Sequence, residues 1–400
     1  MTLPRFPDHT RAGVQSRSRT FARKRLILGI TAVGTAVVGA VCILLVDLPG
    51  ILLSTSREQP WWLAVTTIAL AMCVPLVAAS PFDLVGGAVL VRRPPRAGQW
   101  FAAWARAAVT QLAVWTGVAC VLLGAARIGG AVVAIGAFAV LQLLLASARG
   151  AIAGSAASFS RVGSAGASER IAQAASGASI EVPRVRVVES GDEAFSGGWL
   201  GLWPSTLVVP ASWLQKPLPW LQAALVRRVV AARSGAHTRG VLLAVAWNTF
   251  GFALVQLTVS GDVGTAAGIV RTAAGMTVWT FLAVLLLPTP SRWAVFAVDA
   301  EASRGTEASA IADVIEQTDR WQDDEPARRK AVETIFHPVP ARDERMRRLA
   351  TAAKAPPLRF AAYSVARHAL YLSWGGLSLV SRAVHCNVGR PALLVMLPSD

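Results

Sequence analysis

The chain has 400 residues, of which 54% are hydrophobic and 16% are charged, and its mean hydropathy is +0.49. This composition is more apolar than that of an ordinary soluble domain, so we expect a protein that crosses a lipid bilayer several times. The formal net charge is +16, but the basic residues lie between apolar stretches and not on a recognisable nucleic-acid module. We therefore expect the lipid bilayer, and no nucleic acid, among the partners.

Six apolar stretches are long enough, or nearly so, to cross the hydrocarbon core as helices of about 20 residues. In chain order they are Leu26–Val46, Trp62–Ala79, Ala107–Ala125, Gly130–Ala146, Val241–Ser260 and Thr265–Leu287. The third and fourth are close together with a Gly-rich connection, so they are predicted to form a tight hairpin. The first begins late and lacks a convincing cleavage site, which favours an uncleaved anchor over a signal peptide.

The loops predict the orientation of these spans. Basic residues dominate the N-terminal arm and the second connection, which carries Arg92, Arg93, Arg96 and Arg106. The first and last connections are not basic; they carry Asp47, Arg57, Glu58 and Asp262. Because cytoplasmic loops are enriched in Lys and Arg, we expect a multi-pass protein of the inner (plasma) membrane with both termini in the cytoplasm. Arg271, inside the sixth span, is expected near its non-cytoplasmic end.

The polar segments complete the expected organisation. Strands are predicted at Arg184–Glu189 and Thr206–Val209, followed by a helix that starts near Pro219. From Leu358 onward, apolar residues alternate with Arg359, Arg367 and His368, which predicts an amphipathic helix on the membrane surface. The chain therefore divides into a basic arm (1–25), a four-span membrane region (26–148), the first half of a cytoplasmic domain (149–240), a membrane hairpin (241–287), the second half of that domain (288–350) and an amphipathic C-terminal segment (351–400).

Several motifs occur in a characteristic order. The stretch "VRVVESGDEAF" is a strand followed by a turn and Ala-Phe, and "STLVVPASWL" is a second strand that leads into the helix "ALVRRVVAARSGAH". After the membrane hairpin come "SRWAVFAVDAEA" and "IFHPVPARDERMRRL". This order, over about Val185 to Leu349, resembles the HtpX-type membrane zinc endopeptidases, relatives of the CAAX prenyl endopeptidases. The resemblance implies a mostly α polytopic fold with about six spans and a cytoplasmic α+β metallopeptidase-like domain interrupted by a transmembrane hairpin. It also implies zinc, held by a helical HExxH motif and a third ligand from a later helix.

The residues that this chemistry requires are missing. Carried over residue by residue, the first His falls on Arg228, the general-base Glu on Val229, the second His on Ala232 and the third ligand on Val295. None of these side chains can coordinate zinc or accept a proton from bound water. No two histidines of the chain are four residues apart, so HExxH is absent throughout, and the four cysteines form no CxxC pair. We therefore expect no cofactor, although the resemblance implies zinc.

Other residues match the family pattern outside the zinc ligands. Asp299, His237 and His337 correspond to the Asp of Glu-x-x-Ala-Asp, to the His of Gly-His and to the His of Thr-His-Pro. We interpret them as structural remnants. One arrangement places Arg228 in the vacant metal position, paired with Asp299, with Arg227 facing water or head groups. The alternative is two surface arginines.

The leading hypothesis is a catalytically inactive relative that binds peptides or membrane-protein segments, or modulates a partner. Two alternatives are open. One is an active membrane zinc endopeptidase with a relocated site built from His237, His337, Asp299 and Glu301. The other is a small-solute transporter or an assembly subunit built on the six spans, which contain few ionisable residues.

Overall fold

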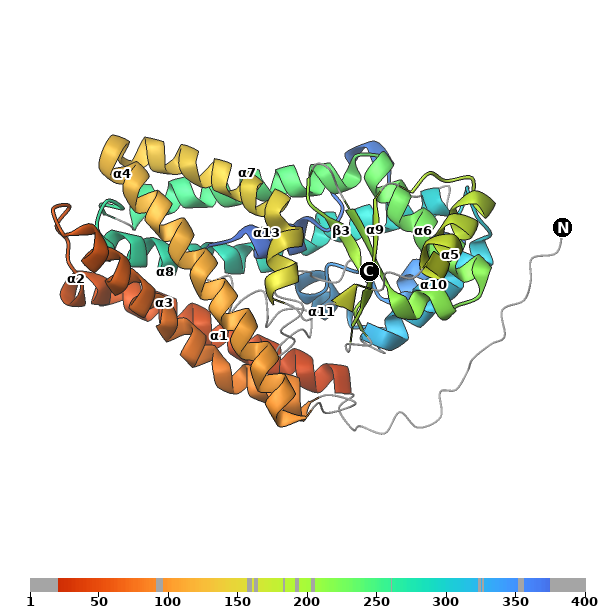
Figure 1. The fold of residues 1–400 in the computed structure, drawn as a ribbon, viewed down its shortest axis with the longest axis horizontal. Coiled ribbons are helices and arrows are strands. Elements are labelled where there is room, and N and C mark those ends of the chain that lie inside the picture. The colour runs from red at the N-terminus through yellow and green to blue at the C-terminus, as the bar shows by residue number, and fades with distance from the viewer. Residues whose placement is uncertain are drawn as a thin grey trace.

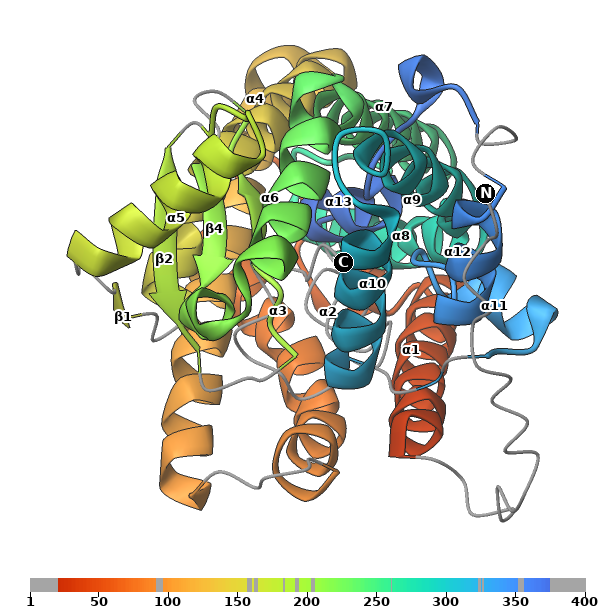
Figure 2. The ribbon, with the colours of Figure 1, turned by 90° about the vertical axis from the view of Figure 1, so that its right-hand side faces the viewer.

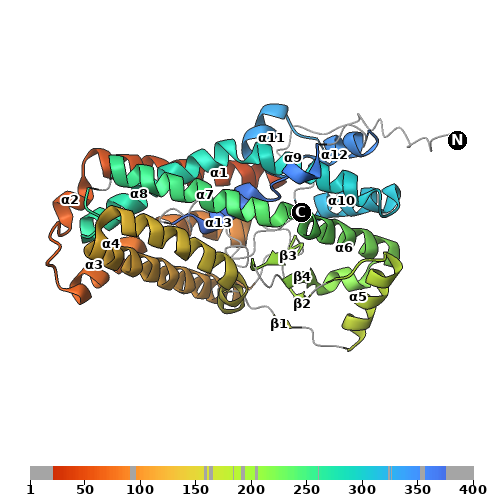
Figure 3. The ribbon, with the colours of Figure 1, turned by 90° about the horizontal axis from the view of Figure 1, so that it is seen from above.

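The structure is a computed structural model that describes residues 21–90, 96–156, 160–161, 165–182, 184–190, 194–202, 206–259, 261–322, 325, 327–351 and 356–374. Long apolar helices occupy one end of the molecule, and a small sheet with shorter helices occupies the other (Figure 1). The same division is visible from above, with the strands beside α5 and α6 (Figure 3). The expected class, a mostly helical polytopic membrane fold with an α+β domain, is confirmed.

Five helices in the described residues are long and apolar enough to cross a membrane. They are α1 (Phe21–Leu45), α3 (Trp61–Leu84), α4 (Ala97–Ala156), α7 (Ala236–Thr258) and α8 (Ala266–Leu286), with the short α2 (Leu48–Leu52) after α1 and the π-helical turn η1 (Val85–Val89) after α3. The six stretches predicted from hydropathy fall on these five helices because α4 contains two of them.

The backbone reverses direction inside α4. Gly129 (φ −138°, ψ 18°) and Gly130 (φ 67°, ψ −160°) leave the helical region. A positive φ with this ψ is open to glycine and strained for other residues, so the Gly-Gly pair permits the turn. In Figure 1 the two halves of α4 run from this turn and diverge, one of them alongside α7. The turn expected from the sequence at the Gly-rich connection is therefore present.

The connections that lack a basic excess lie together at one end of the bundle. Arg271 Nε and Nη2 donate to the two carboxylate oxygens of Asp47 at 2.6 and 2.7 Å. Arg57 pairs with Asp262, with an Nη2–Oδ1 distance of 2.7 Å. Arg127, just before the α4 turn, donates to two carbonyl oxygens of the same connections. These loops therefore share one side of the membrane, and the identity of that side stays a prediction.

A four-stranded mixed sheet forms the centre of the other end. Its strands are β1 (Ser160–Arg161), β2 (Val185–Glu189), β3 (Gly198–Leu200) and β4 (Thr206–Pro210), in the spatial order β1-β2-β4-β3. The β2–β4 pair is parallel and the other two pairs are antiparallel. Two of these strands match those predicted from the sequence, and the three-residue β3 forms one edge of the sheet.

Shorter helices complete the domain, with α5 and α6 beside the strands and α11 and α12 farther from them (Figure 2). They are α5 (Ala165–Gly177), α6 (Leu218–Arg233), α9 (Pro288–Ala302), α10 (Ala308–Gln322), α11 (Lys330–Phe336) and α12 (Arg342–Leu349), with 3-10 turns η2 (Ala211–Gln215) and η4 (Leu358–Phe360). Leu207 of β4, Leu225 of α6 and Ile311 of α10 are fully buried in one cluster. Each such side chain contributes about 1.5–3 kcal/mol by leaving water, which fixes α6 between the sheet and α10.

The helix α13 (Val365–Leu372) does not lie on the membrane surface as its amphipathic sequence predicted. All eight residues are buried, and its apolar residues join one cluster with Val241 of α7 and Ala283 of α8. That expectation is therefore wrong for 365–372; residues 375–400 lie outside the described residues. The polar face, with Arg367 and His368, is turned to an internal pocket instead of to water.

Candidate functional site

The interface of α6 and α9 holds a buried ionic triad. Arg227 Nε donates to Asp299 Oδ1 at 2.8 Å. Arg345, from α12, donates through Nε to Oδ2 at 2.8 Å and through Nη2 to Oδ1 at 3.0 Å. The three side chains are only 3–4% exposed. One carboxylate thus joins three helices, and the cost of burying its charge is offset by two guanidinium groups.

The triad corrects the expected pairing. Asp299 is bound by Arg227 and Arg345, whereas Arg228 was expected to be its partner. The alternative of two surface arginines is also wrong, because Arg227 and Arg228 are only 3% and 2% exposed. Successive residues of a helix point about 100° apart, so the two adjacent arginines leave α6 in different directions.

The contacts place the face of α6 that meets α9 one residue earlier in the chain than the sequence alignment did. Val295 of α9 shares a buried cluster with Ala231, one turn after Arg227. The face of α6 turned toward the third-ligand position therefore carries residues 227 and 231, not 228 and 232 as the sequence alignment placed it. Ala232 packs instead with the sheet-side cluster, and Val229 is buried.

Arg228 binds on the sheet side of α6. Its Nη2 donates to the Ser196 carbonyl at 3.2 Å and its Nη1 to the Tyr363 hydroxyl at 3.3 Å. Its guanidinium carbon lies 5.7 Å from the ring centre of Trp213, within cation–π range. The Trp199 indole donates to the Arg228 carbonyl oxygen at 2.8 Å. Arg228 thus connects α6 to the edge strand β3 and to the segment before α13.

These residues do not fit a zinc ion, whether the ligand helix is aligned as the sequence predicts or one residue earlier as the contacts indicate. Zinc requires lone pairs from His, Cys, Asp or Glu at the metal, and neither 227, 228 and 231 nor 228, 229 and 232 supply any. Among the described residues, no group of three or more such side chains is arranged to hold a metal. The relocated set of His237, His337, Asp299 and Glu301 is fully described and is not assembled into such a group.

His337 lies in a different, strongly basic environment. Its side chain is buried, at 3% exposure. Burial first, and then the charges of Arg328, Arg292 and Arg367, lower the pKa of His337 well below its ordinary value. The imidazole is therefore neutral at physiological pH, as expected for a structural residue of the core.

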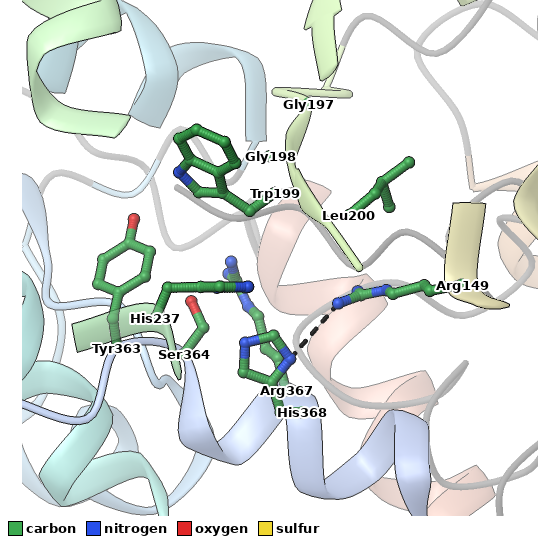
Figure 4. Close-up of a pocket in the computed structure, with 10 residues that line it drawn as sticks. All are labelled: Arg149, Gly197, Gly198, Trp199, Leu200, His237, Tyr363, Ser364, Arg367 and His368. Atoms are coloured by element: carbon green, nitrogen blue, oxygen red, sulfur yellow. Dashed lines mark hydrogen bonds between the residues drawn. The ribbon is translucent and has the colours of Figure 1, made fainter. Parts of the chain in front are cut away.

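A small pocket lies between β3, the end of α4, the start of α7 and α13, with a cavity volume of about 20 Å³ (Figure 4). Gly197 to Leu200 of the β3 segment form one wall. The other lining residues are Arg149, His237, Tyr363, Ser364, Arg367 and His368. Figure 4 shows Arg149 and His237 reaching toward the same space from opposite sides. No Asp or Glu is among these lining residues.

Close backbone packing positions one wall of this pocket. The Tyr363 N–H donates to the Ala236 carbonyl at 3.0 Å. A Cβ on Gly240 would clash with the Tyr363 carbonyl oxygen, so only glycine lets α7 approach the segment before α13 so closely. Arg239 Nε and Nη2 donate to the carbonyls of Ala361 and Leu358 at 3.0 and 2.8 Å. Tyr363 and Ser364 are thereby held against α7.

The protonation state of His368 follows from its partner. Arg149 Nη1 lies 3.4 Å from His368 Nδ1, and because a guanidinium can only donate, Nδ1 accepts. Burial, followed by the charges around it, lowers the pKa of His368 well below its ordinary value. The ring is therefore neutral with its proton on Nε2. That Nε2–H has no hydrogen-bond partner among the described residues.

His237 completes the polar group. Its ring lies edge-to-face with that of His368, with centroids 5.1 Å apart. Its Nε2 is also buried without a hydrogen-bond partner in the part of the chain that is described. The pocket thus contains two permanent cations, Arg149 and Arg367, and two imidazole nitrogens that are able to bind a further group.

Sequence reasoning found His237 but missed its neighbours. Arg149 was read only as the first residue of a cytoplasmic segment, and Arg367 and His368 were assigned to a surface helix. The signal was present in "VARHALYL", where two adjacent polar residues, Arg367 and His368, interrupt an apolar run. That pattern fits a helix on a membrane and a buried helix beside a polar pocket equally well.

A scan of protein-family models and a search of curated proteins both return no match for this chain. Among solved structures, the chain matches the crystal structure of Ste24p from S. mikatae with a TM-score of 0.65. The match covers 82% of this chain and 86% of that one, at 13% sequence identity. The fold is that of Ste24p. At this identity the likeness establishes the architecture, in agreement with the resemblance seen in the motif order.

Proposed function

We propose that this protein binds peptides or membrane-protein segments, or modulates a partner, without cleaving peptide bonds through zinc. The observation that supports the proposal is the set of side chains where α6 meets α9: Arg227, Ala231 and Val295 lie there, and none of them can coordinate zinc. Ste24p is a CAAX prenyl protease of a zinc metalloprotease family. We infer that this chain keeps that fold and lacks that chemistry.

The edge strand β3 is covered. In the sheet order β1-β2-β4-β3, this strand has a neighbouring strand on one side only, but all three of its residues are buried. Pairing of an extended peptide with this edge therefore requires the segments that cover it to move aside.

The proposed orientation places the sheet and the pocket in the cytoplasm. The basic arm (1–25) and the basic second connection support this placement by the positive-inside rule. We propose the plasma membrane as the location of the multi-pass chain, with both termini cytoplasmic. Cysteine labelling of single sites in 47–60 and 96–106 in intact cells and in inverted vesicles tests it.

The test of inactivity uses the full-length protein purified in detergent. We expect less than 0.1 mol of zinc per mol of protein by mass spectrometry, on the order of a contaminant, and no chelator-sensitive cleavage of unfolded casein. Stoichiometric zinc together with cleavage abolished by a chelator would overturn the proposal.

Restoring the zinc ligands tests which residues of α6 face Val295 on α9. The variant Arg227→His, Arg228→Glu, Ala231→His, Val295→Glu is expected to gain zinc, because it rebuilds two His at i and i+4 facing a Glu on α9. The matched control carries the same ligands at 228, 229, 232 and 295. Zinc in the control and not in the first variant would contradict the one-residue shift.

A further inference from the structure

The small pocket where the start of α7 meets the start of α13 has the size of a water molecule (Figure 4). Its cavity volume is about 20 Å³, and His237, Ser364 and His368 are among the residues that line it. A buried water needs a cavity of about 10–15 Å³. The pocket therefore has room for one water and for nothing much larger.

The two imidazole rings have opposite hydrogen-bonding roles at this pocket. His237 bonds the Gly201 backbone, and its Nε2 has no hydrogen-bond partner among the described residues. In the neutral ring Nδ1–H therefore makes the bond to Gly201, and Nε2 is left as an acceptor. His368 Nδ1 accepts from Arg149, so its Nε2 carries the proton and is a donor, also without a partner in the part of the chain that is described.

One small group that both donates and accepts can satisfy the two nitrogens together. The rings are 6% and 5% exposed and touch edge to face, with centres 5.1 Å apart. One bridging molecule with two hydrogen bonds of about 2.7–3.2 Å can span such a separation. A metal cation cannot accept from His368 Nε2–H, and an anion without a proton cannot donate to His237 Nε2. Water meets both requirements and the volume.

The backbone at Ser364 is a second sign of a binding site. Ser364 has φ 58° and ψ 24°, in the left-handed region, and its side chain does not cap α13. Residues other than glycine keep this conformation where the surrounding structure requires it, and such residues cluster where ligands bind. In Figure 4 the Ser364 hydroxyl points toward His237, on the side where the free nitrogen of His368 also lies. It can supply a third hydrogen bond, and buried waters typically make about three.

We propose that this pocket is the binding site of one ordered water, which donates to His237 Nε2, accepts from His368 Nε2–H and contacts the Ser364 hydroxyl. The water joins the first turn of α7 to the first turn of α13. It gives His237 and His368 a role that needs no metal. The inference does not depend on the proposed function of the protein, since it concerns how α13 is held inside the bundle.

A crystal or cryo-microscopy structure of the full-length protein, at a resolution that shows ordered waters, tests the proposal directly. We expect one isolated peak about 2.7–3.2 Å from both Nε2 atoms. The variant His237→Phe keeps a ring but removes the acceptor, so the peak should be lost. The matched control His337→Gln changes a buried histidine outside the pocket and should retain the peak. If His237→Phe does not fold, His368→Phe removes the donor instead.

Histidine-selective ¹⁵N NMR in detergent tests the tautomers in solution. The chain has only five histidines, so the variants assign the signals. We expect Nδ1–H at His237 and Nε2–H at His368, with magnetisation transfer from the His368 proton to water that is lost in His237→Phe. Nε2–H on both rings would overturn the proposal. So would a wild-type pocket without the peak, a side chain of this protein in its place, or a peak that persists in His237→Phe.

Discussion

Substitution of Asp299 by Asn removes one charge from the triad and leaves the shape of the side chain almost unchanged. Arg227 and Arg345 would then share a buried amide, which cannot neutralise either cation. Removing one partner of a buried ion pair costs about 3–5 kcal/mol. With about 2 cal/mol/K of unfolding entropy per residue over a domain of about 150 residues, this corresponds to a midpoint lower by roughly 10–17 °C.

The same helix provides a matched control. Glu301 pairs with Arg304 at the surface of α9, where the side chains are 39% and 66% exposed. Glu301→Gln makes the same chemical change in a pair worth about 0.2–1 kcal/mol, so its midpoint should stay within about 3 °C of the wild type. Both are measured by circular dichroism during heating of the full-length protein in one detergent. Equal midpoints for the two variants would refute the assignment of a stabilising role to the triad.

Two further predictions concern His337 and Gly240. Burial and the charge of Arg328 lower the pKa of His337. Below about pH 6.5, His337 is therefore protonated in the unfolded chain while it is still neutral in the folded protein. Stability should therefore fall as the pH drops from about 7.5 to 5.5, and less steeply in His337→Gln; identical pH profiles would argue against this origin. Gly240→Ala forces a Cβ against the Tyr363 carbonyl and should cost about 1–3 kcal/mol. Gly34→Ala, with no atom within 4 Å, should be neutral or slightly stabilising in the same heating assay, so that similar losses in both would contradict the close approach.

The membrane part was predictable because hydropathy alone determines it. Runs of about 20 apolar residues must become helices where water cannot satisfy the backbone, and Gly129–Gly130 marked the turn within α4. The strands β2 and β4 were visible as apolar runs. The strand β3 was not, because a three-residue strand that begins with glycine carries no periodic signal.

The site was less predictable, for a geometric reason. An alignment error of one residue rotates a helical side chain by about 100°, which is enough to exchange the roles of Arg227 and Arg228. The sequence showed that HExxH is absent, but it could not show which arginine meets Asp299. Likewise, the composition of 365–372 could not distinguish a polar face turned to water from one turned to Arg149, because that depends on helices far away in the chain.

The contact between Asp47 and Arg271 has a consequence for biogenesis. The two residues are 224 positions apart in the chain. At about 5–20 residues per second, ribosomes need roughly 10–45 s to make the intervening chain. During that interval Asp47 has no Arg271 to pair with, so the ion pair between the two connections forms only after α7 and α8 have been inserted.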